Sequence, residues 1–202
     1  MILPIPPLTI VCLLLLALFQ TRPCLALTFT QKGQTALLSG PIKDGDEISF
    51  KEFITDPVHA QITMIRLNSS GGRVIVARDI GRMIRSKNLT TFIDAKTDNC
   101  SSACTVLFGA DVKRHYVNGN TIKDGVYDFK ELTVGLGYHE GNTPLSRDAN
   151  RYSGQATADM IAAYYEFGVS KAKDLITLAP PNKLYRILAQ TALDLGLATS
   201  LS

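Results

Sequence analysis

The sequence predicts a single α/β domain. Strand-like and helix-like segments alternate between residues 62 and 139, and residues from about 154 onward have helical periodicity. After residue 26 the chain has 176 residues, which is enough for one compact domain with a hydrophobic core and too few for two independent domains. We therefore expect one domain over residues 27–202, with helices at its C-terminal end.

The elements follow one another along the chain with recognisable turn signals. Val76, Ile80, Met83 and Ile84 have the spacing of one helix face, and the arginines between them are expected on a solvated face. Strands are expected over 62–67, 89–93, 112–117 and 134–139, with short strands joined by turns over 27–53. Helices are expected over 76–84, 158–167, 170–178 and 184–195, with a short apolar helix beginning within 100–108 and an excursion or hairpin over 118–131.

Charge is spread evenly along the chain. Arg22 is the only charged residue of residues 1–26, so the remainder carries 20 basic and 18 acidic residues, a net charge of about +2. A nucleic-acid-binding protein usually gathers Lys and Arg into a patch that neutralises phosphates. The dispersed and nearly neutral balance therefore argues against nucleic acid as a partner.

Residues 1–26 resemble a secretory signal peptide. Residues 8 to 19 form an almost unbroken apolar run of 12, which is too short to span a hydrocarbon core that needs about 20 residues. Cys24 and Ala26 place small residues at the minus-three and minus-one positions of a cleavage site. We expect cleavage before Leu27, a periplasmic or secreted protein, and no membrane anchor afterwards. No Lys or Arg precedes the run, so an uncleaved anchor is the alternative.

Export would leave Cys100 and Cys104 in an oxidising compartment. No His or Cys pair stands at zinc spacing beside them, so a metal site is not expected. A disulfide between the two, with Cys100 just before a helix, is the favoured interpretation. Two free buried thiols are the alternative.

Three features could carry chemistry. Gly71 and Gly72 follow a strand and precede a helix, where backbone N–H groups can stabilise an oxyanion, although a Gly-Gly turn alone is more often only a tight turn. Ser102 stands at the start of an apolar helix, as a nucleophile or simply as an N-cap. His139 ends a Gly-rich strand, where a histidine is most often just a polar residue leaving the core. The order of these elements favours a catalytic site.

Several short motifs together resemble one known group of proteins. They are Leu38-Ser39-Gly40-Pro41-Ile42, Gly45-Asp46, Leu67-Asn68-Ser69-Ser70-Gly71-Gly72, Cys100-Ser101-Ser102-Ala103-Cys104, Gly137-Tyr138-His139 and Leu195-Gly196-Leu197-Ala198. In this combination the chain, from about residue 36 to residue 200, resembles exported bacterial relatives of the Clp protease proteolytic subunit, within the ClpP/crotonase superfamily. The resemblance implies an α/β fold of repeated ββα units with C-terminal helices, and no cofactor.

The resemblance also implies roles for individual residues. Ser102 would be the nucleophile and His139 its general base, while the backbone N–H groups of Gly71 or Gly72 and of Ala103 would form the oxyanion hole. The chain departs from the family pattern at Ser70, where proline is usual, and more seriously at the third catalytic position. An aspartate is expected there, shortly before the closing helix, and the chain offers Asn182.

Three functions remain open at this point. The leading hypothesis is an exported serine hydrolase, a peptidase acting on peptides or proteins through an acyl-enzyme. The second is a non-catalytic relative that uses the same groove to bind a peptide or to assemble with partners, and relatives form rings or stacked trimers, so a homo-oligomer is one candidate assembly although the sequence does not determine the oligomeric state. The third is crotonase-type chemistry on an acyl thioester, which is disfavoured because coenzyme A is not expected outside the cytoplasm.

Overall fold

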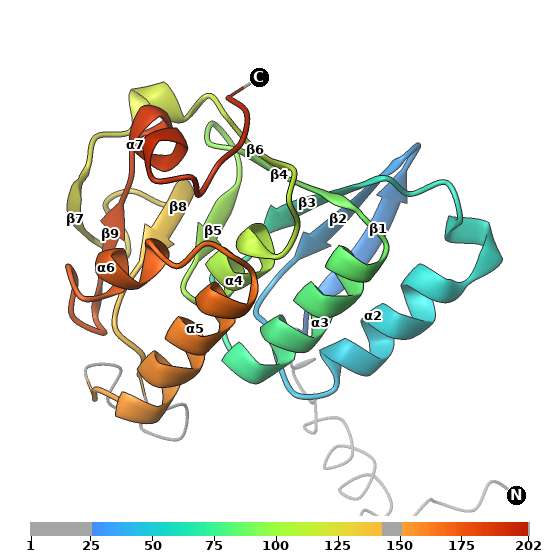
Figure 1. Ribbon diagram of the computed structural model, residues 1–202, viewed down its shortest axis with the longest axis horizontal. Coiled ribbons are helices and arrows are strands. Elements are labelled where there is room, and N and C mark those ends of the chain that lie inside the picture. The colour runs from blue at the N-terminus through green and yellow to red at the C-terminus, as the bar shows by residue number, and fades with distance from the viewer. Residues whose placement is uncertain (1–25, 143–150, 202) are drawn as a thin grey trace, which may run out of the picture.

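The computed structural model describes residues 26–142 and 151–201, and these form two mixed sheets with helices packed against them (Figure 1). The larger sheet has the order β1-β2-β3-β4-β6. Its strands are β1 (Thr28–Lys32), β2 (Thr35–Ser39), β3 (Met64–Asn68), β4 (Thr90–Asp94) and β6 (Arg114–Val117). The α/β fold class predicted from the sequence is confirmed.

The larger sheet begins with a hairpin and continues as a parallel sheet. β1 and β2 are antiparallel and are joined through Gly33, whose φ of 58° suits the tight turn between strands that twist to the right. β2, β3, β4 and β6 are parallel. Along β2, β3 and β4 every second residue is fully buried, so one face of the sheet supplies the core.

Helices α2 (Asp46–Thr55) and α3 (Val74–Ser86) follow strands β2 and β3 of this sheet, and α3 packs against both α2 and α4 (Ala103–Gly109). Figure 1 shows α2 and α3 side by side in front of the sheet. The sequence analysis expected only strands and turns over 27–53, so α2 corrects that prediction. Phe50 and Ile54 are buried at helical spacing, and Asp46 and Glu47 occupy the first turn, where acidic residues favour a helix.

The smaller sheet has the order β5-β8-β9-β7. Its strands are β5 (Asn99–Ser101), β8 (Gly135–Tyr138), β9 (Lys183–Arg186) and β7 (Gly125–Asp128). The expected helix over 184–195 is wrong in its first part, because Leu184 and Arg186 are buried alternately within β9, and only α7 (Ala189–Asp194) is helical. β9 is antiparallel to both β7 and β8, so this strand is stabilised by partners distant in sequence.

The remaining helices are α5 (Gly154–Glu166) and α6 (Ala172–Ile176), with 3₁₀ turns at Pro57–His59 and Gly119–Thr121. α5 is held to α3 by arginines that the sequence analysis placed on a solvated face. Arg78 and Arg82 both pair with Glu166, at 2.5 and 2.6 Å. Arg85 donates hydrogen bonds to the carbonyl oxygens of Glu166 and Phe167 at the end of α5. These contacts fix α5 beside α3.

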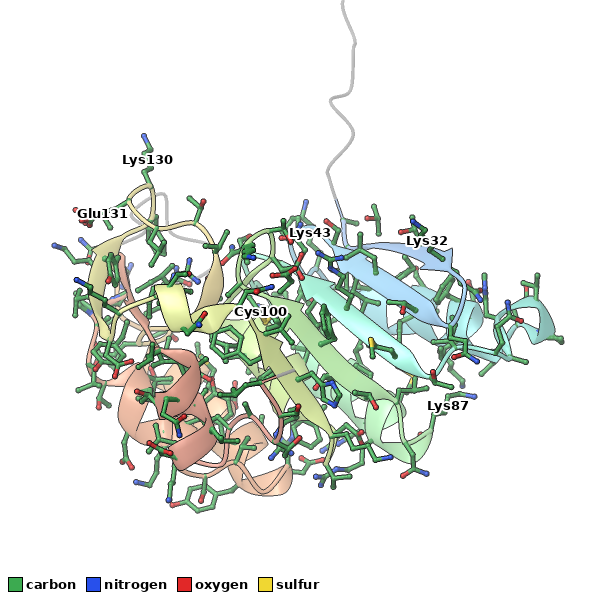
Figure 2. The ribbon with its side chains drawn as sticks, turned by 90° about the horizontal axis from the view of Figure 1, so that it is seen from above. Lys32, Lys43, Lys87, Cys100, Lys130 and Glu131 are labelled. Carbon is green, nitrogen blue, oxygen red and sulfur yellow. A yellow bond between two sulfur atoms is a disulfide. The ribbon has the colours of Figure 1, made fainter. Side chains whose placement is uncertain are left out.

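The two sheets meet where β3 and β5 approach one another. Ser69, which follows β3, forms a parallel bridge with Cys100 of β5, and the Ser69 N–H donates to the Asn99 carbonyl oxygen. Figure 2 shows Cys100 in the middle of the molecule, whereas Lys130 and Glu131 point outward from the segment between β7 and β8. Over residues 26–142 and 151–201, no helix has the length and apolar character needed to cross a membrane.

Candidate active site

Ser102 lies in a sharp turn between strand β5 and helix α4. Its backbone has φ 55° and ψ −128°, a region that residues with a side chain rarely adopt and that costs about 1–3 kcal/mol. Hydrogen bonds hold the turn in place: the Ser102 N–H donates to the Gly137 carbonyl oxygen at 2.9 Å, and the Thr105 hydroxyl donates to the Ser102 carbonyl oxygen at 2.6 Å. A strained strand-to-helix turn of this kind lifts a nucleophilic hydroxyl clear of the sheet.

The Ser102 hydroxyl is not used to stabilise the structure. Ser102 occupies the N-cap position of α4, but its side chain makes no capping hydrogen bond. Within the described part of the chain the hydroxyl has no hydrogen-bond partner. Its side chain therefore does not cap the helix, and the residue is partly exposed.

A disulfide brackets Ser102. Cys100 in β5 and Cys104 in α4 are bridged, with their Cα atoms 5.1 Å apart, which lies within the usual range for disulfides. Both cysteines are fully buried. The predicted disulfide is thus confirmed, and it ties together the strand and the helix on either side of the serine.

The Gly71-Gly72 turn approaches Ser102 more closely than any side chain would permit. A Cβ atom on Gly71 would lie 2.5 Å from the Ser101 carbonyl oxygen, 2.7 Å from the Ser102 Cβ and 3.0 Å from the Ala103 nitrogen. Gly72 has φ 142°, and a Cβ there would lie 2.1 Å from the Ile42 carbonyl oxygen. Both positions therefore require glycine. The structure brings the predicted glycine turn and the predicted serine into direct contact.

Two backbone N–H groups beside Ser102 have no acceptor within residues 26–142 and 151–201. The Gly71 N–H already donates to the Ser69 hydroxyl at 3.1 Å. By contrast, the N–H groups of Gly72 and of Ala103, the first residue of α4, have no acceptor among the described residues. Of the candidate oxyanion donors, Gly72 and Ala103 are therefore the ones available to a ligand.

His139 follows strand β8 and is only 4% exposed. Its Nδ1 atom lies 2.6 Å from the Glu140 carbonyl oxygen, and its ring meets the edge of Phe129 at 6.0 Å between centroids. Burial lowers the pKa of the imidazole, and the hydrogen bond to the Glu140 carbonyl partly opposes that effect. Ser102 and His139 both lie in the described part, and no hydrogen bond joins them.

Asn182 lies in the exposed turn that leads into β9. Because β9 pairs with β8, this turn is at the same end of the smaller sheet as His139. Between these two described residues there is no hydrogen bond. The structure thus brings together Ser102 and the glycine turn, and places His139 and Asn182 near the same sheet end, with no hydrogen bond from either of these two described residues to the serine.

Beneath the site lies a buried arginine that the sequence analysis did not identify. Arg186 of β9 is 1% exposed, and its guanidinium donates to the carbonyl oxygens of Gly135 (2.7 Å) and Leu132 (3.0 Å) and to the Asn99 side-chain oxygen (3.1 Å). Burial lowers the pKa of Arg186 to about 10. Through these contacts one side chain joins β5, β8 and β9, and so holds in register the strands that present Ser102.

Ser102 opens into a cleft of about 230 Å³ between the beginnings of α3 and α5. One wall is formed by residues 72 to 75, and the other by Ser153, Gln155, Ala156, Asp159 and Met160. In Figure 1, α5 lies beside the lower end of α3. Residues of α5 were not recognised as part of the site, because nothing in the sequence indicates that this late helix packs against α3. His139 is not among the residues that line the cleft.

Comparisons with known proteins show the fold of the chain but do not assign the chain to a family. No protein-family model matches the chain, and no curated protein matches its sequence. Two solved structures that are similar are both of the 1510-N membrane-bound stomatin-specific protease, at 15% identity. A serine-to-alanine mutant has a TM-score of 0.55 and covers 82% of this chain and 77% of its own. A lysine-to-alanine mutant in complex with a substrate peptide has a TM-score of 0.54 and covers 82% of this chain and 73% of its own.

The chain therefore has the ClpP/crotonase-like fold, as the resemblance in its motifs implied. Identity of 15% over most of the chain supports the architecture alone. Among the described residues, no group of three or more His, Cys, Asp or Glu side chains is placed to hold a metal ion. The proposed chemistry therefore rests on the geometry of the residues around Ser102.

Proposed function

We propose that the protein is an exported serine hydrolase, a peptidase, in which Ser102 attacks a peptide carbonyl. One observation carries the proposal: the Ser102 hydroxyl and the N–H groups of Gly72 and Ala103 lie together at a strained turn, and none of the three has a hydrogen-bond partner among the described residues. In acyl transfer the carbonyl oxygen becomes an oxyanion, and two backbone donors at such a position stabilise it in the transition state. The peptidase fold of the two similar structures, one of them bound to a substrate peptide, supports a peptide as the ligand.

His139 is the proposed general base. The Glu140 carbonyl can only accept a hydrogen bond, so the nearby Nδ1 carries the proton and the Nε2 lone pair is left to act as a base. The lowered pKa keeps the ring neutral near pH 7, as a base requires. In the acylation step Nε2 takes the Ser102 proton and then passes it to the leaving amine, and a water molecule later hydrolyses the acyl-enzyme. The ring must turn toward Ser102 for this, because the two are not hydrogen-bonded at rest.

Asn182 is proposed as the third member of the site. An asparagine can orient an imidazole through its carbonyl oxygen but does not supply the negative charge that stabilises the imidazolium. The expected hydrolysis is therefore slow. One of the similar structures carries a lysine-to-alanine substitution, but no lysine lines the cleft in the described part of this chain, so the proposal rests on His139.

A non-catalytic peptide-binding module is the second candidate. The observation in its favour is that Ser102 and His139 are not hydrogen-bonded. A peptide-library cleavage assay with the mature protein separates the two functions. Cleavage that disappears in Ser102→Ala and in His139→Gln, and that persists in Ser153→Ala, another serine of the cleft, would support the hydrolase. Peptide binding without any cleavage would favour the module.

Export is the last part of the proposal. Removal of residues 1–26 would create a free amino group at Leu27, whose nitrogen lies 3.3 Å from the carboxylate of Asp46. Asp46 is buried and also accepts from the Lys43 N–H at 2.7 Å, so the new ammonium would meet a carboxylate already in place. Terminal sequencing of material from the periplasm or the medium should give Leu27. An intact Met1 on the mature, functional protein would contradict export by cleavage.

A further inference from the structure

Two of the described residues that line the cleft beside Ser102 are charged, and only one of them, Arg73, has an oppositely charged partner within the described part of the chain. Arg73 pairs with Asp44, whose carboxylate lies 2.9 Å from the Arg73 Nε and outside the cleft. Asp159 has no cationic partner among the described residues. Its only hydrogen bond there comes from the Gln155 side-chain amide at 2.8 Å. The cleft therefore has an unbalanced negative charge at Asp159.

The hydrogen bond from Gln155, four residues earlier on α5, does not by itself explain Asp159, because such a bond stabilises a helix only weakly. An acidic side chain stabilises a helix within the first turn, and Asp159 lies in the second turn of α5, which begins at Gly154. Nor is it simply a solvated surface residue, because it is half-buried in the wall of the cleft. Its carboxylate is open to the cleft and has no cation among the described residues, so the cationic group of a ligand can pair with it there.

The size and walls of the cleft indicate what that ligand is. A volume of about 230 Å³ is below the roughly 300–1,000 Å³ of pockets that enclose whole small ligands, so one long side chain suits it better. Val74, Ile75 and Met160 give the cleft apolar walls, and Met160 is fully buried. Lysine and arginine lay their methylene chains along apolar surface and keep the charged end at a polar group.

We propose that this cleft takes a lysine or arginine side chain of the substrate next to the scissile bond, with Asp159 binding its charged end. The inference rests on the proposed peptide-binding function of the cleft, and it names Asp159 as a residue that determines specificity. A neutral side chain of the same length would fill the apolar part and leave the Asp159 carboxylate unpaired. A glutamate would be repelled.

Binding to Ser102→Ala protein tests this without requiring any catalysis. Fluorescent pentapeptides Ala-Ala-X-Ala-Ala, with lysine, norleucine or glutamate as X, are titrated and followed by anisotropy. The lysine peptide should bind about fivefold more tightly than the norleucine peptide, as expected for one partly exposed ion pair. Asp159→Asn should remove that preference, and Asp159→Arg should transfer it to the glutamate peptide.

Asp194→Asn is the matched control, because Asp194 accepts an equivalent hydrogen bond from Gln190 on α7, at 2.7 Å, outside the cleft. It should leave the lysine preference unchanged. Equal affinities for lysine and norleucine, a preference that survives Asp159→Asn, or no binding of any peptide would each overturn the inference. Fluorophosphonate labelling of unmodified protein tests the hydrolase separately. A lysine preference without labelling would contradict only the hydrolase proposal. Labelling without a lysine preference would contradict only the inference about Asp159.

Discussion

Gly71 and Ser102 are packed so closely that no side chain fits at position 71. A methyl group on Gly71 would come within 2.7 Å of the Ser102 Cβ, and Gly71 also has φ 92°. The glycine turn after β3 is therefore part of the structure that holds the serine in its strained conformation.

Gly71→Ala should destabilise the protein and abolish reaction at Ser102. Gly45→Ala is the matched control, because Gly45 has φ 95° and nothing lies within 4 Å of an added Cβ. The control should cost about 1–2 kcal/mol from backbone strain alone. Gly71→Ala should cost about 1–3 kcal/mol more because of overpacking. Denaturant unfolding measures both. Equal free energies of unfolding for the two variants would show that the contact with Ser102 is easily relieved.

The disulfide should contribute stability and hold the Ser102 turn in place. Because it closes a loop of only a few residues, removing it by replacing both Cys100 and Cys104 with alanine should cost about 2 kcal/mol, the low end of the usual range. In mass spectrometry, reduction of the mature protein should add two hydrogens. Two alkylatable thiols in native, unreduced protein would contradict the bridge.

Acidification should destabilise the protein through His139. Burial lowers the pKa of His139 in the folded state, so between the unfolded and the folded pKa values the unfolded chain binds more protons. The stability from a neutral His139 is fully present above the unfolded pKa and is lost as the pH falls through the folded pKa. When the pH falls from 7.5 to 5, the free energy of unfolding should decrease less in His139→Gln than in the native protein. Parallel pH profiles of unfolding free energy would mean that His139 titrates as it does in the unfolded chain.

Asn182→Asp should raise the rate of hydrolysis. A carboxylate at the end of the sheet where His139 lies would favour the imidazolium formed during attack. We expect an increase of at least about tenfold in hydrolysis of an activated ester, corresponding to ~1.4 kcal/mol. Asn120→Asp adds the same charge at an exposed 3₁₀ turn and should have no effect. Equal rates for Asn182→Asp and the native protein would show that the Glu140 carbonyl alone orients His139.

The parts of the fold that were predicted are those whose signal is local. α3 shows its buried face in the spacing of Val76 and Ile80, and β3 is an apolar segment that ends at a glycine turn. β9 was missed because Leu184 and Arg186 acquire their strand partners from residues more than 45 positions away. Arg186 was missed for a related reason. From the sequence alone an arginine is expected at the surface, and only the structure shows that backbone carbonyl groups distant in sequence surround Arg186.

Part of the candidate site could also be predicted from the sequence. Ser102 and the glycine turn could be identified because each stands between a strand and a helix, and the parallel bridge between Ser69 and Cys100 brings the two turns together where the sheets meet. The wall formed by α5 could not be predicted from the sequence, because the position of this helix depends on the ion pairs of Arg78 and Arg82 with Glu166, which is distant in sequence. Asp159 owes its place in the cleft to those contacts.

The central claim is that Ser102 is an activated nucleophile, and fluorophosphonate labelling tests it most directly. Mature protein is incubated with the probe and the modified residue is mapped by peptide mass spectrometry, with Ser153→Ala and Ser102→Ala alongside. The account predicts one adduct per chain, located on Ser102, retained in Ser153→Ala and absent from Ser102→Ala. An adduct that persists in Ser102→Ala, or no adduct in the native protein, would contradict it.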